Sequence, residues 1–370
     1  MVAETRIHGM TERERYIKTL AFESVDRLPV WHAYGLMPGV LDSWHAEGLP
    51  ETVQNKEDVR RYFGFGWNPS PLPLRLGPIP AFETKVVEET AEYRIAIDAW
   101  GRKTKLLKAV TTLPLATEFP VSDWDSWRTI KARLETTPDR IGDDIGKTVE
   151  ENLYAGQINR FGAMGFYWFP RDLMGDLNLS VAYYEQADLI HDINETWCSL
   201  IEYVLTGAIE RIPIDEIHFA EDMAYRNASM IGPGIFDEFM RPYYERIRAI
   251  VNRFDVPIFS VDTDGCTNEL IHWFRDCGIN LSGPNEVQAG NDIVAYRQEF
   301  GTSMAYFGGL DKRVLAKGRD SIGAMLEGAV PPMMKSGGGW VVSLDHRVVP
   351  GTKLADFIYY LDRVAELTTF

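Results

Sequence analysis

Ionisable side chains stand at the ends of four apolar segments in the second half of the sequence. The segments are rich in β-branched and aromatic residues, which is typical of buried strands. The polar residues that follow them are Glu221, Asp222, Asp262, Asp264, Cys266, Glu286, Asp345 and His346. The carboxyl ends of the strands in a β/α barrel meet at one face, so these side chains should converge there. We expect one shared pocket that contains Glu221, Asp262, Asp264, Glu286 and His346.

Such a set of side chains can do two kinds of chemistry. Carboxylate, thiolate and imidazole groups are ligands of zinc, and a catalytic zinc keeps one coordination position open. Without a metal, the same carboxyl groups can transfer protons or cap the helices that follow the strands. The candidates for catalysis are Glu221 and Asp262, and those for metal binding are Asp264, Glu286, His346 and Cys266.

Other residues are candidates for the wall of a substrate pocket. Four consecutive aromatic residues occupy positions 166–169 and precede Pro170. They indicate either an aromatic pocket wall or the start of a helix wedged between other elements. The substrate-binding candidates are His32, Phe166, Tyr167, Trp168 and Tyr225. His218 falls in the middle of a predicted strand, and we interpret it as a core residue.

Strands and helices alternate through the last two thirds of the sequence. Strands are predicted at 153–158, 214–220, 256–261, 279–281, 304–307 and 340–344, and helices follow them, for example at 268–276 and 354–367. This order predicts a TIM-type (β/α)8 barrel in the α/β class, with an N-terminal extension. Residues 84–108 alternate polar and apolar side chains and predict a β-hairpin insertion, within about 84–118, in a single 1–370 domain.

The composition limits the class of protein further. The chain has 370 residues, of which 45% are hydrophobic, and a formal net charge of -16. This negative charge argues against binding to nucleic acid. The sequence has no apolar run typical of a membrane span or a signal peptide, and its three cysteines make no disulfide framework. We therefore expect a cytoplasmic protein without a membrane association.

Motifs along nearly the whole chain resemble the uroporphyrinogen decarboxylase superfamily. They read RERYIKTLAFESVDRLPV, EDMAYRN, FDEFMRPYYERI, VDTDG, PNEVQAGNDI, YFGGLDKRVL and GGGWVVSLDHRVVP. The resemblance implies a β/α barrel that is either a porphyrinogen decarboxylase or a zinc-dependent methyltransferase working with a corrinoid. The decarboxylases bind a polycarboxylate with arginine in the loop after the first strand. The loop at 32–45 here has no Arg or Lys, so the chain is more similar to the methyltransferases.

The methyltransferase resemblance implies zinc and a corrinoid. Asp262 and Asp264 stand where thiol-methylating members have a His-x-Cys pair, and His346 stands where they have a distant Cys. Ligands with oxygen and nitrogen donors would leave more positive charge on the metal and suit the cleavage of a methyl ether. The D-x-H-x-x-G pattern of a corrinoid-binding segment is absent, so the corrinoid is expected on a separate partner protein.

The sequence thus predicts an enzyme, a zinc-dependent methyltransferase. It would move a methyl group from a small methylated substrate, such as a methoxyarene in an O-demethylase reaction, to the corrinoid protein. One alternative is a metal-free decarboxylase or lyase that acts on a small carboxylate and uses Asp262 or Asp264 as the acid. Another is a catalytically silent barrel that serves as a subunit of a complex. All three are compatible with a homodimer.

Overall fold

The protein is built around a parallel β-sheet, described here from a computed structural model that covers residues 9–32, 34–65, 71–108 and 113–369. Its six strands follow the order β10-β9-β8-β7-β6-β5. They are β5 (Arg160–Met164), β6 (Glu216–Ala220), β7 (Ile258–Asp262), β8 (Leu281–Gly283), β9 (Ala305–Leu310) and β10 (Trp340–Leu344). All five pairs of neighbouring strands are parallel, so their carboxyl ends lie at one edge, as in a β/α barrel.

A further segment extends this sheet beyond β10. Val30 pairs in parallel with Val342, and the Trp31 amide donates to the Val342 carbonyl at 2.9 Å. The first strand of the sheet is therefore present at Val30 as a short bridge. No pairing joins this segment to β5 within the described ranges, so closure into an eight-stranded barrel stays a prediction.

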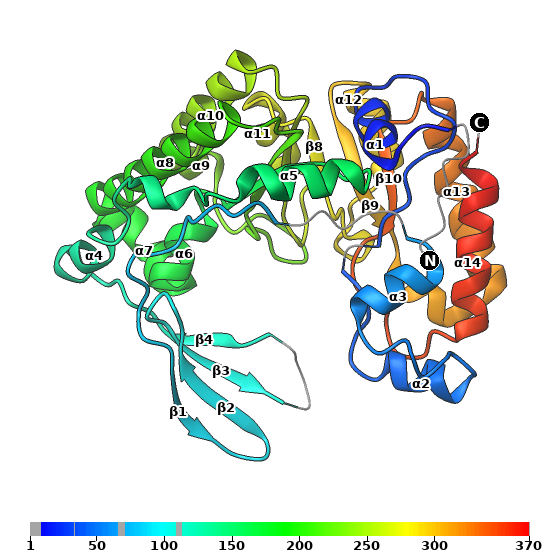
Figure 1. The fold of residues 1–370 in the computed structure, drawn as a ribbon, viewed down its shortest axis with the longest axis horizontal. Coiled ribbons are helices and arrows are strands. Elements are labelled where there is room, and N and C mark those ends of the chain that lie inside the picture. The colour runs from blue at the N-terminus through cyan, green and yellow to red at the C-terminus, as the bar shows by residue number, and fades with distance from the viewer. Residues whose placement is uncertain (1–8, 33, 66–70, 109–112, 370) are drawn as a thin grey trace.

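Helices surround the sheet (Figure 1). One group gathers on one side of the molecule and contains α4 (Trp124–Lys131), α6 (Trp168–Met174), α7 (Asp176–Glu185), α8 (Ala187–Ile209), α9 (Pro233–Phe239), α10 (Arg241–Arg253) and α11 (Leu270–Asp276). The other contains α1 (Glu12–Leu20), α2 (Val40–Ala46), α3 (Lys56–Phe63), α12 (Ile293–Phe300), α13 (Arg319–Lys335) and α14 (Leu354–Leu367). Helix α5 (Ile145–Tyr154) precedes β5. No helix in the described part of the chain is long and apolar enough to cross a membrane.

The predicted hairpin insertion is part of a larger antiparallel sheet. Its four strands are β1 (Lys85–Glu89), β2 (Tyr93–Ile97), β3 (Lys103–Leu107) and β4 (Leu115–Glu118), paired in chain order. Figure 1 shows this sheet projecting from the helices around α6. Trp100 anchors it, because its ring packs edge-on against Phe169 and Trp197 at 5.8 and 6.4 Å between ring centroids.

Several predicted elements are confirmed, and one is wrong. The helix predicted at 354–367 is present as α14. Thr11 caps α1 by accepting a hydrogen bond from the Glu14 amide, and Pro242 stands in the first turn of α10, where its missing amide hydrogen costs nothing. The strand predicted at 153–158 does not form, because α5 runs to Tyr154 and β5 begins only at Arg160. Leu153 and Tyr154 are exposed at the end of α5, and only Ile158 of this short run is buried, in the loop before β5.

Candidate active site

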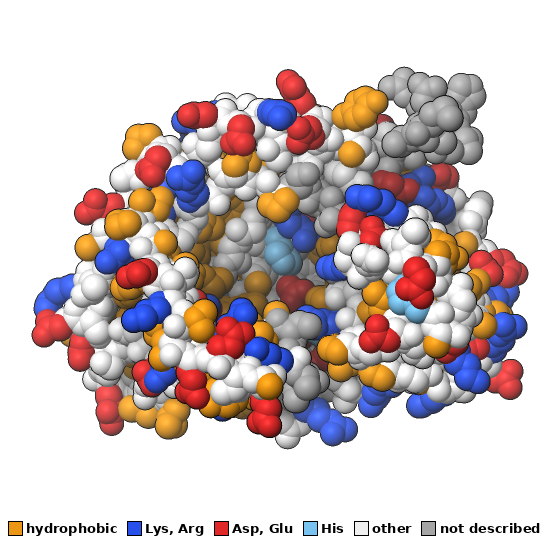
Figure 2. All heavy atoms as spheres, turned by 60° about the horizontal axis from the view of Figure 1, so that its bottom comes forward, with side chains coloured by type: hydrophobic (Ala, Val, Ile, Leu, Met, Phe, Trp, Pro, Cys, Tyr) orange, Lys and Arg blue, Asp and Glu red, His pale blue; other side chains and the backbone are white. Residues whose placement is uncertain are grey.

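A cavity of about 280 Å³ lies on the inner side of the parallel sheet. Much of its wall is aromatic, with side chains from the first strand, the segment after α3, β9 and α14, namely Trp31, Tyr34, Phe65, Phe307 and Phe357. Its charged and polar members come from β5, β6 and β7 and from the segment that carries α3, and they include Arg160, Glu216, His218, Lys56 and Arg60. Figure 2 shows the molecule hollowed in the middle of one face, with hydrophobic side chains on the wall of the hollow. A cavity with an aromatic wall and several polar groups is typical of a small-molecule site.

Asp262 lines this cavity at the carboxyl end of β7. Its Oδ2 atom accepts a hydrogen bond from the Tyr34 hydroxyl at 2.6 Å. Burial raises the pKa of Asp262 to about 6, although the Tyr34 hydrogen bond and the charge of Arg160 act in the opposite direction. An acid with a pKa near neutrality can give up a proton under ordinary conditions, so Asp262 is suited to general acid chemistry.

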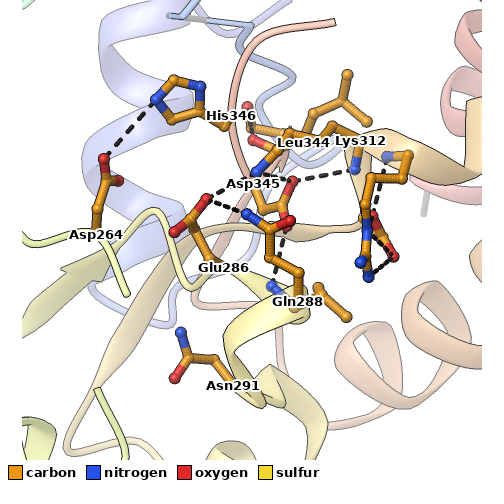
Figure 3. A network of polar contacts seen from close by, with 12 residues as sticks. Asp264, Glu286, Gln288, Asn291, Lys312, Leu344, Asp345 and His346 are labelled. Atoms are coloured by element: carbon orange, nitrogen blue, oxygen red, sulfur yellow. Dashed lines mark hydrogen bonds and ion pairs between the residues drawn. The ribbon is translucent and has the colours of Figure 1, made fainter. Parts of the chain in front are cut away.

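Asp264 and His346 face each other (Figure 3). Neither lines the cavity itself, but His346 contacts Tyr34 of the cavity wall, and this neighbouring region is termed the mouth. The distance between Asp264 Oδ2 and His346 Nε2 is 3.8 Å, and the His346 ring stacks on Tyr34 at 4.9 Å between centroids. The other oxygen of Asp264 is buried and has no hydrogen-bond partner within the described residues. Burial, together with the charges of Asp262 and Glu286, raises the pKa of Asp264 to about 8. Burial also lowers the pKa of His346, which favours its neutral form.

Glu286 and Asp345 organise the loops around this mouth. Glu286 accepts hydrogen bonds from Lys312 Nζ at 2.7 Å, Gln288 Nε2 at 3.0 Å and the Gly265 amide at 3.1 Å. Burial acts to raise the pKa of Glu286, but the contact with Lys312 lowers it overall. Fully buried Asp345 accepts from the Val287 and Lys312 amides, both at 3.0 Å. These two carboxylates therefore hold loop backbone and one lysine in place (Figure 3).

The predicted zinc ligands are not gathered around one point in this structure, and zinc binding stays a prediction. Zinc ligands lie about 2.0–2.3 Å from the ion and surround it as a tetrahedron. No group of three His, Cys, Asp or Glu side chains in the described ranges is arranged to hold a metal ion. Asp264 and His346 face each other, but Glu286 is engaged by Lys312, and the Cys266 sulfur lies 3.3 Å from Asn268 Nδ2. The four residues therefore do not fit zinc in this arrangement.

Glu221, the other predicted catalytic residue, is separated from the cavity. It is fully buried, and its carboxylate accepts from the backbone amides of residues 166, 167 and 168 at 2.9–3.0 Å and from the Tyr244 hydroxyl. These amides belong to the start of α6, where the helix dipole favours a negative charge. A Cβ atom at Gly165 would overlap the Glu221 carboxyl group, which explains the glycine there. Glu221 thus caps α6 and does not join the pocket that the sequence predicts.

The predicted substrate-binding residues have different locations. Phe166 and Tyr167 are buried in the helical core, where Phe166 packs on Tyr243 and Tyr244, so they do not line the cavity. Trp168 is the first residue of α6 and does not line the cavity either. Tyr225 is 60% exposed and lines a separate shallow hollow of about 370 Å³ at the mouth, next to Asp264. His32 does line the cavity, among the rings of Phe65, Phe357 and Tyr360, and burial lowers its pKa to about 3.

A polar network inside the sheet was missed by the sequence analysis. Arg160 and Tyr16 both donate to Glu216 Oε2 at 3.0 Å, and Ser260 donates to Glu216 Oε1 at 2.5 Å. His218 Nδ1 lies 2.8 Å from Ser260 Oγ, and its side chain lines the cavity, so its interpretation as a core residue is wrong. Glu216 and His218 are two positions apart on β6, and this period-2 spacing of polar residues inside an apolar strand was the available signal.

Comparisons with known proteins agree with this architecture. Residues 217–367 match the family model described as uroporphyrinogen decarboxylase (URO-D), which covers β6 to α14. The solved structure of a methyltransferase from Methanosarcina mazei is similar with a TM-score of 0.61. That alignment covers 96% of this chain and 98% of the other, at 17% sequence identity, so it bears on the fold. No curated protein matches the sequence.

Proposed function

We propose that this protein, whose residues 217–367 carry the uroporphyrinogen decarboxylase family domain, is a methyltransferase. It would take a methyl group from a small methylated substrate, such as a methoxyarene, and pass it to the corrinoid of a separate protein. The observation that carries the proposal is the placement of a protonatable carboxyl group, Asp262, at the wall of an aromatic cavity.

The cavity suits one small aromatic molecule. Its volume of about 280 Å³ lies just below the usual range for ligand pockets, which is about 300–1,000 Å³. The aromatic side chains on its wall favour a flat apolar ligand. Two of the cations that line it are already paired, Arg160 with Glu216 at 2.9 Å and Arg60 with Glu57 at 2.5 Å. A polycarboxylate macrocycle would therefore find neither the volume nor the cations that it needs.

The oxygen of an ether is a poor leaving group, and Asp262 can improve it by donating a proton. As the carbon–oxygen bond breaks, its electron pair stays on the oxygen, and the methyl carbon forms its new bond to the acceptor. The oxygen then takes the proton of Asp262, so that it leaves as a hydroxyl group. The Tyr34 hydroxyl, 2.6 Å from Oδ2, donates to the carboxylate that remains. The product is a phenol or alcohol, and the acid recovers its proton from solvent.

The methyl acceptor would approach from the mouth. The hollow of about 370 Å³ beside Asp264 is open and has Tyr225, Arg226 and Arg313 on its wall. No step in this scheme passes through zinc, because the side chains nearest to such a site do not complete a coordination shell. In this scheme Asp262 activates the ether oxygen, the step for which the sequence predicts a zinc ion.

One observation favours the decarboxylase alternative. Lys56 also lines the cavity, and burial together with the charge of Arg347 lowers its pKa. A single ammonium group at this position could attract a substrate with one carboxylate. Methyl transfer and release of carbon dioxide from the same candidate substrate distinguish the two reactions directly.

The test is the Asp262→Asn variant, which keeps the shape of the side chain and removes its proton. Formation of methylcobalamin from cob(I)alamin and a methoxyarene should fall about 10²–10⁴-fold, the usual contribution of a general acid. Glu299→Gln on the outside of α12 is the matched control, because that side chain is exposed, and its rate should not change. Wild-type rates in Asp262→Asn would refute the assignment.

A further inference from the structure

We propose that His218 is a substrate-binding residue whose Nε2 atom accepts a hydrogen bond from a hydroxyl group of the ligand. The cavity would then select arenes that carry a free hydroxyl group in addition to the methoxy group. The methoxy part of this inference rests on the function proposed above, whereas the hydroxyl part rests on the polar network of the cavity alone.

The network decides which nitrogen of His218 carries a hydrogen. The Arg160 guanidinium and the Tyr16 hydroxyl both donate to one oxygen of Glu216. The other oxygen of Glu216 accepts the hydroxyl hydrogen of Ser260 at 2.5 Å. Ser260 has thereby used its only hydrogen and can offer just a lone pair to His218 Nδ1, which lies 2.8 Å away. Nδ1 must therefore be the donor, and it carries the ring hydrogen.

This arrangement leaves a bare lone pair on the other ring nitrogen. A neutral imidazole with its hydrogen on Nδ1 is an acceptor at Nε2. Within the described residues no hydrogen bond engages Nε2, and the His218 side chain is 23% exposed where it lines the cavity. Burial and the charge of Arg160 lower the pKa of His218, so the ring stays neutral and remains an acceptor. A ligand group that donates a hydrogen bond is what this position lacks.

The strand register sets the size of the matching ligand. His218 pairs with Ser260, and Ala220 pairs with Asp262, so Asp262 stands two residues beyond the level of His218. Two residues correspond to about 7 Å along a strand, and positions two apart point to the same face. One benzene ring with an oxygen at each para position is somewhat shorter than this backbone separation, which leaves room for a hydrogen bond from the ligand to a side chain. One ring can therefore place a hydroxyl group at His218 and an ether oxygen at Asp262.

The experiment compares two probes that differ in one methyl group, para-methoxyphenol and para-dimethoxybenzene. Binding to the full chain is measured by calorimetry without any methyl acceptor. The wild-type protein should bind the phenol about tenfold more tightly, since an acceptor left unpaired in a closed site weakens binding. The His218→Phe variant should lose this preference and keep its affinity for the diether. The control His272→Phe changes an exposed histidine on α11 and should keep the wild-type preference.

Several outcomes would overturn the inference. Equal binding of both probes to the wild-type protein does so without any variant, so a folding defect of His218→Phe cannot obscure the result. Retention of the preference in His218→Phe does so as well. Nitrogen NMR of labelled histidine should show the hydrogen on Nδ1, and a hydrogen on Nε2 would contradict the mechanism. If the preference is found but no methyl transfer follows, only the proposed function fails. If the diether is demethylated as fast as the phenol, only this inference fails.

Discussion

The cap that Glu221 forms on α6 leads to a prediction that separates a structural carboxylate from a catalytic one. Glu221→Gln replaces one of the two acceptor oxygens by an amide nitrogen and removes the charge. The carbonyl oxygen that remains can still accept from about two of the four donors, which are the amides of residues 166–168 and the Tyr244 hydroxyl. The new amide group would face the other donors with hydrogens of its own.

The magnitude follows from the number of donors that are lost. A hydrogen bond to a charged group contributes about 1.5–3 kcal/mol, and a buried donor without an acceptor costs about 1–3 kcal/mol. Part of the lost stability is regained, because Glu221→Gln also removes a buried charge. That charge is costly, as the pKa of Glu221 shows, which burial raises to about 7. We expect Glu221→Gln to lower the free energy of unfolding by about 2–4 kcal/mol. Tyr244→Phe removes a single donor and should cost about 1 kcal/mol.

Urea titration followed by circular dichroism measures these changes, and methyl transfer is assayed on the folded fraction. Glu327→Gln is the matched control, since Glu327 is 56% exposed and pairs only with Arg363 in the described part of the chain. Its unfolding free energy should stay within about 0.5 kcal/mol of wild type. If Glu221→Gln keeps wild-type stability but loses methyl transfer, the residue is catalytic and the capping argument is refuted.

Three further predictions follow from the mouth of the cavity. Burial raises the pKa of Asp262 to about 6 and that of Asp264 to about 8, and a general acid acts in its protonated form. The rate of methyl transfer should therefore fall as pH rises through this range, and a rate that rises would contradict the acid role. Elemental analysis should find less than one zinc per chain, whereas full zinc occupancy that His346→Ala abolishes and Cys266→Ala preserves would restore the zinc mechanism. Gly265→Ala should destabilise the protein more than Gly290→Ala does. Both glycines have a positive φ, but only at Gly265 would an added Cβ lie within 2.7 Å of backbone oxygens, those of Ala224 and Tyr225. Equal urea midpoints of the two variants would exclude this contact.

The location of the mouth could be predicted from the sequence because strand ends are a local signal. Asp262, Glu286 and His346 each follow an apolar run, and parallel strands bring their carboxyl ends to one edge. The contact between Asp264 and His346 at 3.8 Å follows from this geometry alone. Tyr34 could not be found in this way, because it lies in a loop 228 positions from Asp262, and no local pattern links the two.

The errors have a common physical origin, which is that a residue type does not reveal what surrounds it. Four aromatic residues in a row at 166–169 allowed either a pocket wall or the start of a helix wedged between other elements, and the structure has the second, with Phe166 and Tyr167 buried at the start of α6. His218 looked like a core residue because its neighbours on the strand are apolar. The inner face of β6, however, carries Glu216 and His218 toward Ser260 of β7, and only the register of the two strands reveals that network.

The hydrogen-bond donors around each carboxyl group divide the acidic residues by role. Glu221 has four donors, Glu286 has three, and Asp345 has two backbone amides and a nearby lysine, so the acceptor capacity of these groups is largely used in holding loops and a helix. Asp262 has the Tyr34 hydroxyl, and Asp264 has a buried oxygen without a partner in the described residues. Burial also raises the pKa of Glu221 and Asp345, but backbone and side-chain donors occupy the oxygens of these two groups. Within the described part of the chain, Asp262 and Asp264 combine a raised pKa with acceptor atoms that are still free for a ligand, so the proposed acid chemistry is assigned to them.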